Sequence, residues 1–206
     1  MKSLRYTLIA IVVSIATATF AQSHDHNTDA QAPAAQPPTI QKSEAQKSFA
    51  ILKTLAGSWD AKIAMEPAMQ GVSGATGRVS LRVTSRGNAV VHEMQESNTP
   101  LDSTKYDHPV TMLYLDDDRL TLIHYCDAGN RPRMVARPSA DGKTVEFDFV
   151  DLSGANKFGH MYHAVFTLVD ANHHTEDWTY MMPGDKPMHA HMELTRASEG
   201  GSASGK

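Results

Sequence analysis

The stretch RLTLIHYCDAGNRPRMVAR, Arg119 to Arg137, consists of two alternating segments around a short turn. Residues 127–129, Asp-Ala-Gly, fit a three-residue hairpin loop, a type I turn followed by glycine in the left-handed position. This loop pairs Leu122 with Met134. One face of the hairpin then carries Leu120, Leu122, His124, Cys126, Met134 and Ala136, and the other carries Arg119, Thr121, Ile123, Tyr125, Arg131, Arg133 and Arg137. A slip of one residue would mix the two sets. We therefore expect His124 and Cys126 to face a core and the arginines to face water.

The same period of two continues through most of the chain beyond Gly57. Alternating segments of this kind predict half-buried β-strands, and short connections rich in Gly, Asn, Asp or Pro favour antiparallel neighbours. Ten strands are predicted, at about 58–66, 77–85, 88–96, 109–116, 119–126, 130–137, 144–150, 161–168, 175–181 and 188–195. Because closure removes exposed edges, we expect an all-β fold, an antiparallel up-and-down β-barrel of about ten strands, with a sandwich as the alternative.

One helix is predicted before the first strand. Ser43 and Gln46 have the spacing of a capping box. Phe49, Leu52 and Leu55 follow at helical spacing, and Gly57 ends the element.

A second hairpin places another histidine on an apolar face. A turn centred on residues 86–87, Arg-Gly, pairs Leu81 with His92 and Val79 with Met94. The inward positions predicted on other strands are Trp59, Ile63, Met65, Val145, Phe147, Phe149, Tyr162, Phe166, Leu168, Glu176, Trp178, Tyr180, Met188, Met192 and Leu194. Three ionisable groups, His92, His124 and Glu176, therefore face the lumen.

These inward polar groups have two interpretations. They satisfy each other or an internal water inside a filled core, or they line a cavity in which a few polar groups orient an apolar ligand. Several inward methionines suit a pliable cavity wall. The sequence favours binding of a small apolar or amphipathic molecule, and the predicted ligand-binding residues are His92, Tyr114, His124, Glu176, Trp178 and Tyr180.

The start of the chain has the pattern of a secretory signal peptide. Lys2 and Arg5 precede an apolar run over residues 7–20, and small residues lead to cleavage after Ala21. We expect a signal peptide at 1–21, a disordered linker at 22–41, a barrel domain at 42–196 and a disordered tail at 197–206. The mature protein is then periplasmic or secreted, and with no cysteine near the cleavage site it has no lipid anchor.

Charge and cysteine content narrow the classes of partner. The formal net charge is −4 and the chain has no block of Lys or Arg, which argues against nucleic acid and anionic membranes as partners. Cys126 is the chain's one cysteine, so no internal disulfide can form, and a buried inert thiol is expected there. The oligomeric state is not indicated by the sequence.

The residues Leu55 to Trp59, LAGSW, run from a helix end into a strand through G-x-W. This resembles the opening of the lipocalin/calycin group and of uncharacterised exported bacterial lipocalin-like proteins. The resemblance covers about residues 42–196 and implies binding of an apolar ligand. It also implies that Arg196, near the end of the last strand, packs across Trp59 and closes the barrel. In its predicted number of strands, the barrel is similar to fatty-acid-binding proteins and nitrobindin-like haem barrels. The G-x-W-x-G-x-G signature of the latter is absent, so haem is not expected.

Zinc binding is the alternative function. His189 and His191 lie on one side of a predicted strand, with Glu193 in line, and two imidazoles with a carboxylate are a partial zinc ligand set. The same alternation gives Ala190 and Met192 to the core, which puts the histidines outside. No other cofactor is predicted.

A small-molecule lyase or isomerase is the third hypothesis. A histidine and a glutamate facing a hydrophobic cavity have the shifted pKa values that general acid–base catalysis uses. The sequence offers no nucleophile with an attached base and no phosphate cradle, so binding is expected rather than catalysis.

Overall fold

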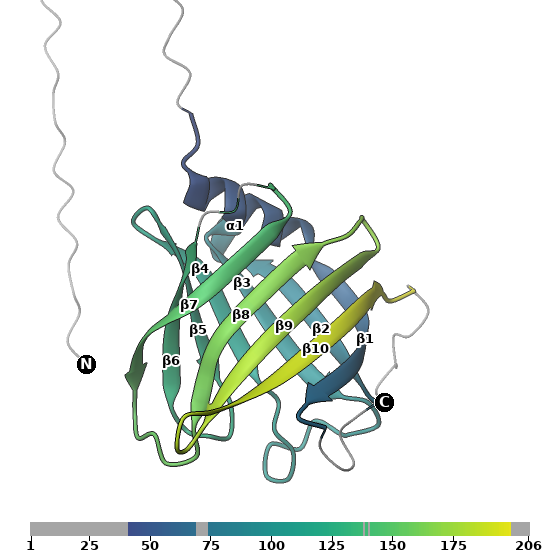
Figure 1. Cartoon of the computed structure of the whole chain (residues 1–206). Coiled ribbons are helices and arrows are strands. Elements are labelled where there is room, and N and C mark those ends of the chain that lie inside the picture. Colours follow the sequence, from purple (N-terminus) through teal and green to yellow (C-terminus); the bar gives the residue numbers. More distant parts are fainter. Residues whose placement is uncertain (1–40, 69–73, 138, 140, 199–206) are drawn as a thin grey trace, which may run out of the picture. The chain divides into compact units, whose positions relative to one another are not determined.

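The computed structural model describes residues 41–68, 74–137, 139 and 141–198. The predicted signal peptide and most of the predicted linker and tail lie outside these residues. Helix α1 (Glu44–Thr54) precedes ten strands (Figure 1). The strands are β1 (Gly57–Glu66), β2 (Ala75–Thr84), β3 (Ala89–Glu96), β4 (Val110–Asp116), β5 (Arg119–Tyr125), β6 (Arg131–Arg137), β7 (Thr144–Ser153), β8 (His160–Leu168), β9 (His173–Met182) and β10 (Lys186–Arg196).

The strands form a closed antiparallel barrel in which each strand pairs with its neighbours in sequence. β1 pairs with both β2 and β10 and so closes the ring. The prediction of a ten-strand up-and-down barrel is therefore confirmed, and the sandwich alternative is wrong. Closure removes the two free edge strands that an open sheet would have.

The two predicted hairpin registers are correct. Leu122 pairs with Met134 across β5 and β6, and Leu81 pairs with His92 across β2 and β3. Gly129 has a φ of 72°, the left-handed conformation that the turn requires. The turn between β2 and β3 is longer than predicted, because the last paired residues are Thr84 and Ala89 and a short 3-10 segment (Ser85–Gly87) fills the gap.

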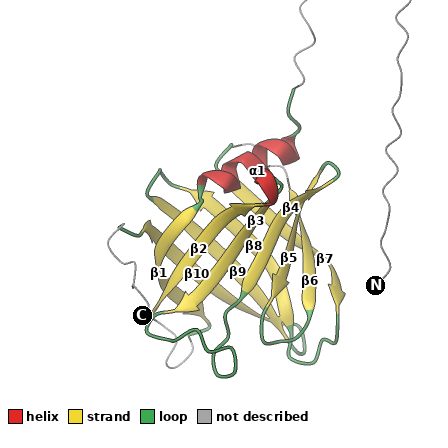
Figure 2. Ribbon diagram, turned by 180° about the vertical axis from the view of Figure 1, so that it is seen from behind, coloured by secondary structure: helices red, strands yellow, loops and turns green. Residues whose placement is uncertain are grey.

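Helix α1 closes one end of the barrel. Its capping box is formed: the backbone N–H of Gln46 donates to Ser43 Oγ at 3.2 Å, and the backbone N–H of Ser43 donates to Gln46 Oε1 at 3.2 Å. Phe49 and Leu52 are buried in the core against the barrel strands. In Figure 2 the helix lies across one end, while the other end carries only loops. We call these the closed end and the open end. No helix in the described part of the chain is long and apolar enough to span a bilayer.

The core fills the closed half of the lumen. Its fully buried large side chains include Trp59, Leu113, Leu120, Leu122, Met134, Phe147, Phe166 and Leu194. The arginines of the opening hairpin lie outside, as predicted: Arg133 bridges Asp151, and Arg137 bridges Glu146 and Asp148.

Candidate functional site

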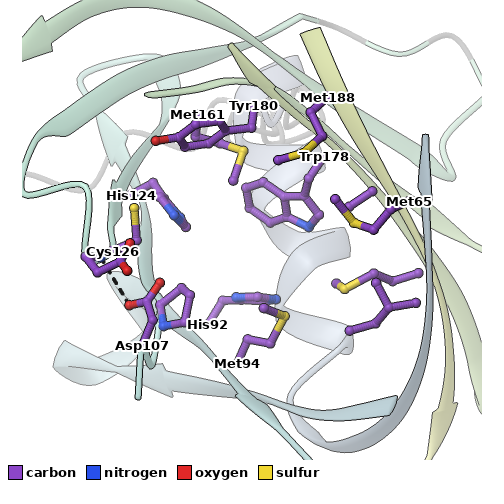
Figure 3. Close-up of a pocket in the computed structure, with 15 residues that line it drawn as sticks. Met65, His92, Met94, Asp107, His124, Cys126, Met161, Trp178, Tyr180 and Met188 are labelled. Atoms are coloured by element: carbon purple, nitrogen blue, oxygen red, sulfur yellow. Dashed lines mark hydrogen bonds between the residues drawn. The ribbon is translucent and has the colours of Figure 1, made fainter. Parts of the chain in front are cut away.

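A cavity of about 290 Å³ occupies the lumen towards the open end (Figure 3). Strand β1 starts next to α1 and runs away from it, and Met65 lies near the far end of this strand. Because Met65 lines the cavity, the cavity lies at the end of the barrel away from the helix. The lining residues are Ile63, Met65, His92, Met94, Asp107, Pro109, His124, Cys126, Asp127, Met161, Trp178, Tyr180, Met188, Ala190 and Met192. The wall is therefore mainly apolar, with a few polar groups.

Five methionines supply much of this wall, from β1, β3, β8 and β10. Figure 3 shows the labelled Met65, Met94, Met161 and Met188 around the lumen with Trp178 between them. Thioether side chains are unbranched and polarisable, so they adapt to ligands of different shape.

His124 is a neutral polar group in the wall. It comes from β5, is 5% exposed, and its Nδ1 lies 2.8 Å from Thr111 Oγ1 on the neighbouring strand β4. Burial lowers the pKa of His124 to about 4, and the charge of His92 acts in the same direction. At neutral pH the imidazole therefore carries one N–H and one lone pair, and can orient a ligand without attracting an anion.

His92 belongs to a buried network one layer deeper. Its Nε2 lies 3.0 Å from Oε2 of Glu176, a residue of β9 that is completely buried. The Trp178 indole N–H donates to the same oxygen at 3.0 Å, and Nε2 of His174 lies 3.1 Å from Oε1. Both carboxyl oxygens of Glu176 are thus occupied by protein groups.

Glu176 is ionised in this network. Burial by itself raises the pKa of its carboxyl, but the electrostatic interaction with His92 and the hydrogen bonds from His174 and His92 outweigh that effect and hold the pKa below its usual range. Since a carboxylate only accepts hydrogen bonds, the Nε2 atoms of both histidines must carry protons. The network fixes the orientation of His92.

The remaining ring nitrogen of His92 has no partner among the described residues. His92 is 3% exposed, and its Nδ1 is one of a few buried polar atoms without a hydrogen bond; Nδ1 of His174 is another. His174 packs instead against Trp59, edge to face at 4.2 Å. Of these two histidines, His92 is the one in the cavity wall, so its Nδ1 is available to a ligand or a water.

The structure brings most of the predicted ligand-binding residues together. His92, His124, Trp178 and Tyr180 line the cavity, and Glu176 lies behind His92. Tyr114 does not line it: its strand neighbour Leu113 is fully buried in the core, so Tyr114 projects to the other face of β4. Both faces of β4 are apolar in sequence, which is why alternation misplaced Tyr114.

A β-bulge changes the predicted orientation of Tyr162. The register of β8 against β9 shifts between Met161 and His163. Consequently Met161 enters the cavity wall, while Tyr162 is 42% exposed. The inward position predicted for Tyr162 is wrong.

The residues predicted to close the barrel are in contact at the closed end. Arg196 Cζ lies 4.1 Å from the centre of the Trp59 ring, and its Nη1 donates to the Ala56 carbonyl at 3.0 Å. The Trp59 indole N–H donates to the Leu55 carbonyl at 2.8 Å. Gly57 has a φ of 141°, and a Cβ there would lie 2.5 Å from Arg196 Nη1, so glycine lets the guanidinium reach Trp59.

The predicted zinc residues lie on the outer surface of β10. His189, His191 and Glu193 are exposed, and Nδ1 of His191 pairs with Asp177 at 2.6 Å. Within the described residues they are not one of the groups whose ligand atoms lie together. Zinc at this strand remains a prediction.

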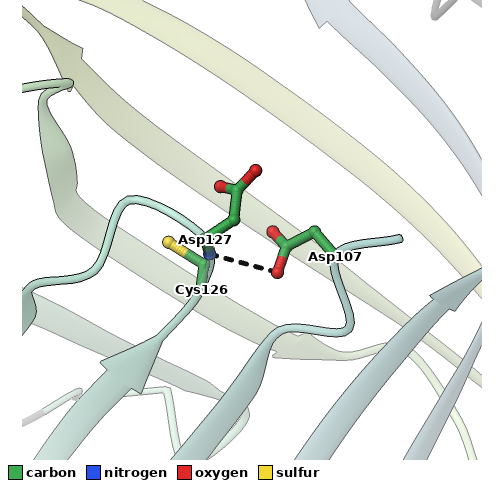
Figure 4. A group of neighbouring side chains, drawn as sticks. All are labelled: Asp107, Cys126 and Asp127. Carbon is green, nitrogen blue, oxygen red and sulfur yellow. Dashed lines mark hydrogen bonds between the residues drawn. The ribbon is translucent and has the colours of Figure 1, made fainter. Parts of the chain in front are cut away.

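Three functional candidates were missed or undervalued from sequence. Asp107 and Asp127 come from loops, which have no periodicity to reveal where they point, and they meet Cys126 at the mouth of the cavity (Figure 4). His174 was not among the predicted inward residues, but β9 begins at His173 and His174 is buried. The signal available in the sequence was its spacing from Glu176, because residues two apart on a strand lie on the same face.

Comparisons with known proteins add little. No family model matches the chain, and no curated protein matches it. Among solved structures it is similar to a protein of unknown function from the DUF3598 family of Nostoc punctiforme, with a TM-score of 0.45 and 9% identity over 80% of this chain. The match covers 53% of that protein, so this chain spans about half its length. A similarity this distant carries no argument about function. The class that the fold defines is a closed antiparallel β-barrel with a lumenal cavity.

Proposed function

We propose that this protein is an exported, calycin-like binding protein that holds a small, mainly apolar molecule in the open half of its lumen. The observation that carries the proposal is the cavity of about 290 Å³, with an apolar wall and a buried His92 nitrogen that lacks a partner. Pockets of this kind, apolar with a few convergent polar groups, are typical ligand sites.

Two further features support the finer parts of the proposal. The calycin-like assignment is supported by α1 at the closed end and by the contact between Trp59 and Arg196. Export is supported by the charged start and the apolar run before Ala21.

The polar groups suit binding better than catalysis. His124 is paired with a hydroxyl, Thr111, rather than with a carboxylate. Both oxygens of Glu176 accept from protein donors, so this carboxylate is not free to remove a proton from a ligand. In our proposal His124 and His92 orient the ligand, while Trp178 and the methionines supply contact area.

Native mass spectrometry of protein produced with its leader in a bacterial host tests the proposal. Ala190 lines the cavity beside Trp178 and Met65, so Ala190→Phe fills it. Ala64 is exposed on the outer face of β1, so Ala64→Phe is the matched control. We expect wild type and Ala64→Phe to carry an organic adduct that is lost on denaturation, and Ala190→Phe to be bare. The proposal fails if wild type stays bare even after incubation with a lipid extract of the host, or if Ala190→Phe carries the same adduct.

A further inference from the structure

Two acidic side chains lie at the mouth of the cavity. Among the described residues that line it, none is Lys or Arg, whereas Asp107 and Asp127 lie on its rim. Ligand atoms of these two carboxylates and of the Cys126 thiol all lie within 4.8 Å of one another. The nearby Lys105 is occupied elsewhere, at 3.2 Å from Asp102.

A backbone hydrogen bond holds the Asp107 carboxyl group in place. Its Oδ1 accepts a hydrogen bond from the Asp127 backbone amide at 3.1 Å (Figure 4). Burial, and then the charge of Asp127, raise the pKa of the Asp107 carboxyl, and the Asp127 amide and His108 oppose this only in part. The two aspartates thus repel each other, and a cation placed between them would relieve the repulsion.

The cavity behind this mouth indicates what kind of cation fits. Its wall is mainly apolar and includes the Trp178 indole. Among the described residues of this wall, Nδ1 of His92 is a buried polar atom without a partner, and the residue is 3% exposed. A bare metal ion would leave this space unfilled. Burial also raises the pKa of Cys126, which keeps it a thiol rather than the thiolate that metals bind.

We propose that the ligand is an amphipathic amine, with its ammonium group held between Asp107 and Asp127 at the mouth and its apolar body among the methionines and Trp178. This inference rests on the proposed function and narrows it. An anionic amphiphile such as a fatty acid is disfavoured, because its carboxylate would meet two aspartates at the mouth and no Lys or Arg among the described lining residues.

Isothermal titration of three ligands with the same apolar body tests the inference. Octylamine is protonated at pH 7.5, octan-1-ol is neutral and octanoate is an anion. We expect wild type to bind octylamine at least tenfold more tightly than octan-1-ol, and octanoate most weakly. The double variant Asp107→Asn/Asp127→Asn should bind octylamine and octan-1-ol equally.

The matched control removes the same charge at the closed end. Asp117 and Asp118 are exposed in the turn between β4 and β5, so Asp117→Asn/Asp118→Asn should keep the amine preference. Binding of octan-1-ol without any preference for the amine overturns this inference but leaves the proposed function intact. Persistence of the preference in Asp107→Asn/Asp127→Asn also overturns it. Failure of all three ligands to bind also overturns this inference, and the native mass spectrum then decides whether the proposed function stands.

Discussion

The two ends of this barrel use similar residue types for different purposes. At the closed end, Trp59 is capped by Arg196, donates to a backbone carbonyl and packs on His174. At the open end, Trp178 and His124 each have one protein partner, Glu176 and Thr111, and their rings also line the cavity. The closed end is filled by packed side chains, whereas the open end leaves an apolar wall and the Nδ1 atom of His92 without a protein partner. In our proposal, the closed half of the lumen maintains the fold and the open half binds the ligand.

The two halves meet at Glu176, and its removal should have the largest effect. Glu176→Ala leaves His92, His174 and Trp178 without their acceptor in a buried site, which should lower the free energy of unfolding by about 3–5 kcal/mol. Urea denaturation measures the change. Glu193→Ala, on the exposed face of β10, is the control and should stay within about 0.5 kcal/mol. A loss below about 1 kcal/mol for Glu176→Ala would show that the network does not support the fold.

Acid should weaken the open half through His124. The pKa of His124 falls from 6.5 to about 4 on folding because the ring is buried. Between these values the unfolded chain binds more protons than the folded one, so stability is complete above about pH 6.5 and declines as the pH falls towards 4. The shift corresponds to about 3 kcal/mol.

Denaturation curves between pH 7 and pH 4 test this contribution. His124→Gln cannot titrate, so its stability should depend less steeply on pH than that of wild type across this window. Equal slopes for the two proteins would contradict the burial of a neutral imidazole at this position.

Removing the cap at the closed end should have a smaller, separate effect. Arg196→Ala loses the cation–π contact with Trp59, and we expect a cost of about 1–2 kcal/mol. Because Arg196 lies far from the cavity mouth, the dissociation constant for a lumenal ligand should not change. A variant with normal stability but weakened ligand binding would contradict the separation of the two ends.

The outer face of β10 should give the smallest effect. The pair formed by His191 and Asp177 is about half exposed, so His191→Ala should change stability by about 0.5 kcal/mol or less. Thermal melts with and without added zinc test the alternative metal site. If His189 and His191 bind zinc, the metal will raise the melting temperature of wild type but not of His191→Ala.

Alternation of buried and exposed residues predicted the barrel because each strand has one face in the core, which penalises any slip in register. The registers of His92 and His124 were correct for this reason. Alternation does not predict side-chain direction where a strand has two apolar faces, contains a bulge, or gives way to a loop. Both faces of β4 are apolar, which misplaced Tyr114; a bulge in β8 reversed Tyr162; and Asp107 lies in a loop whose direction depends on tertiary packing. The cavity volume likewise depends on how the side chains pack, which sequence does not specify.

The two tryptophans, one at each end, allow the most direct test of this account. Trp59→Phe keeps Trp178 as the reporter of the cavity, and Trp178→Phe keeps Trp59 as the reporter of the closed end. Titration with 8-bromooctan-1-ol, whose bromine quenches indole fluorescence at contact range, should quench Trp59→Phe saturably and in competition with octan-1-ol. It should leave Trp178→Phe unchanged. Equal quenching of both reporters, or none of Trp178, would contradict a ligand cavity confined to the open end.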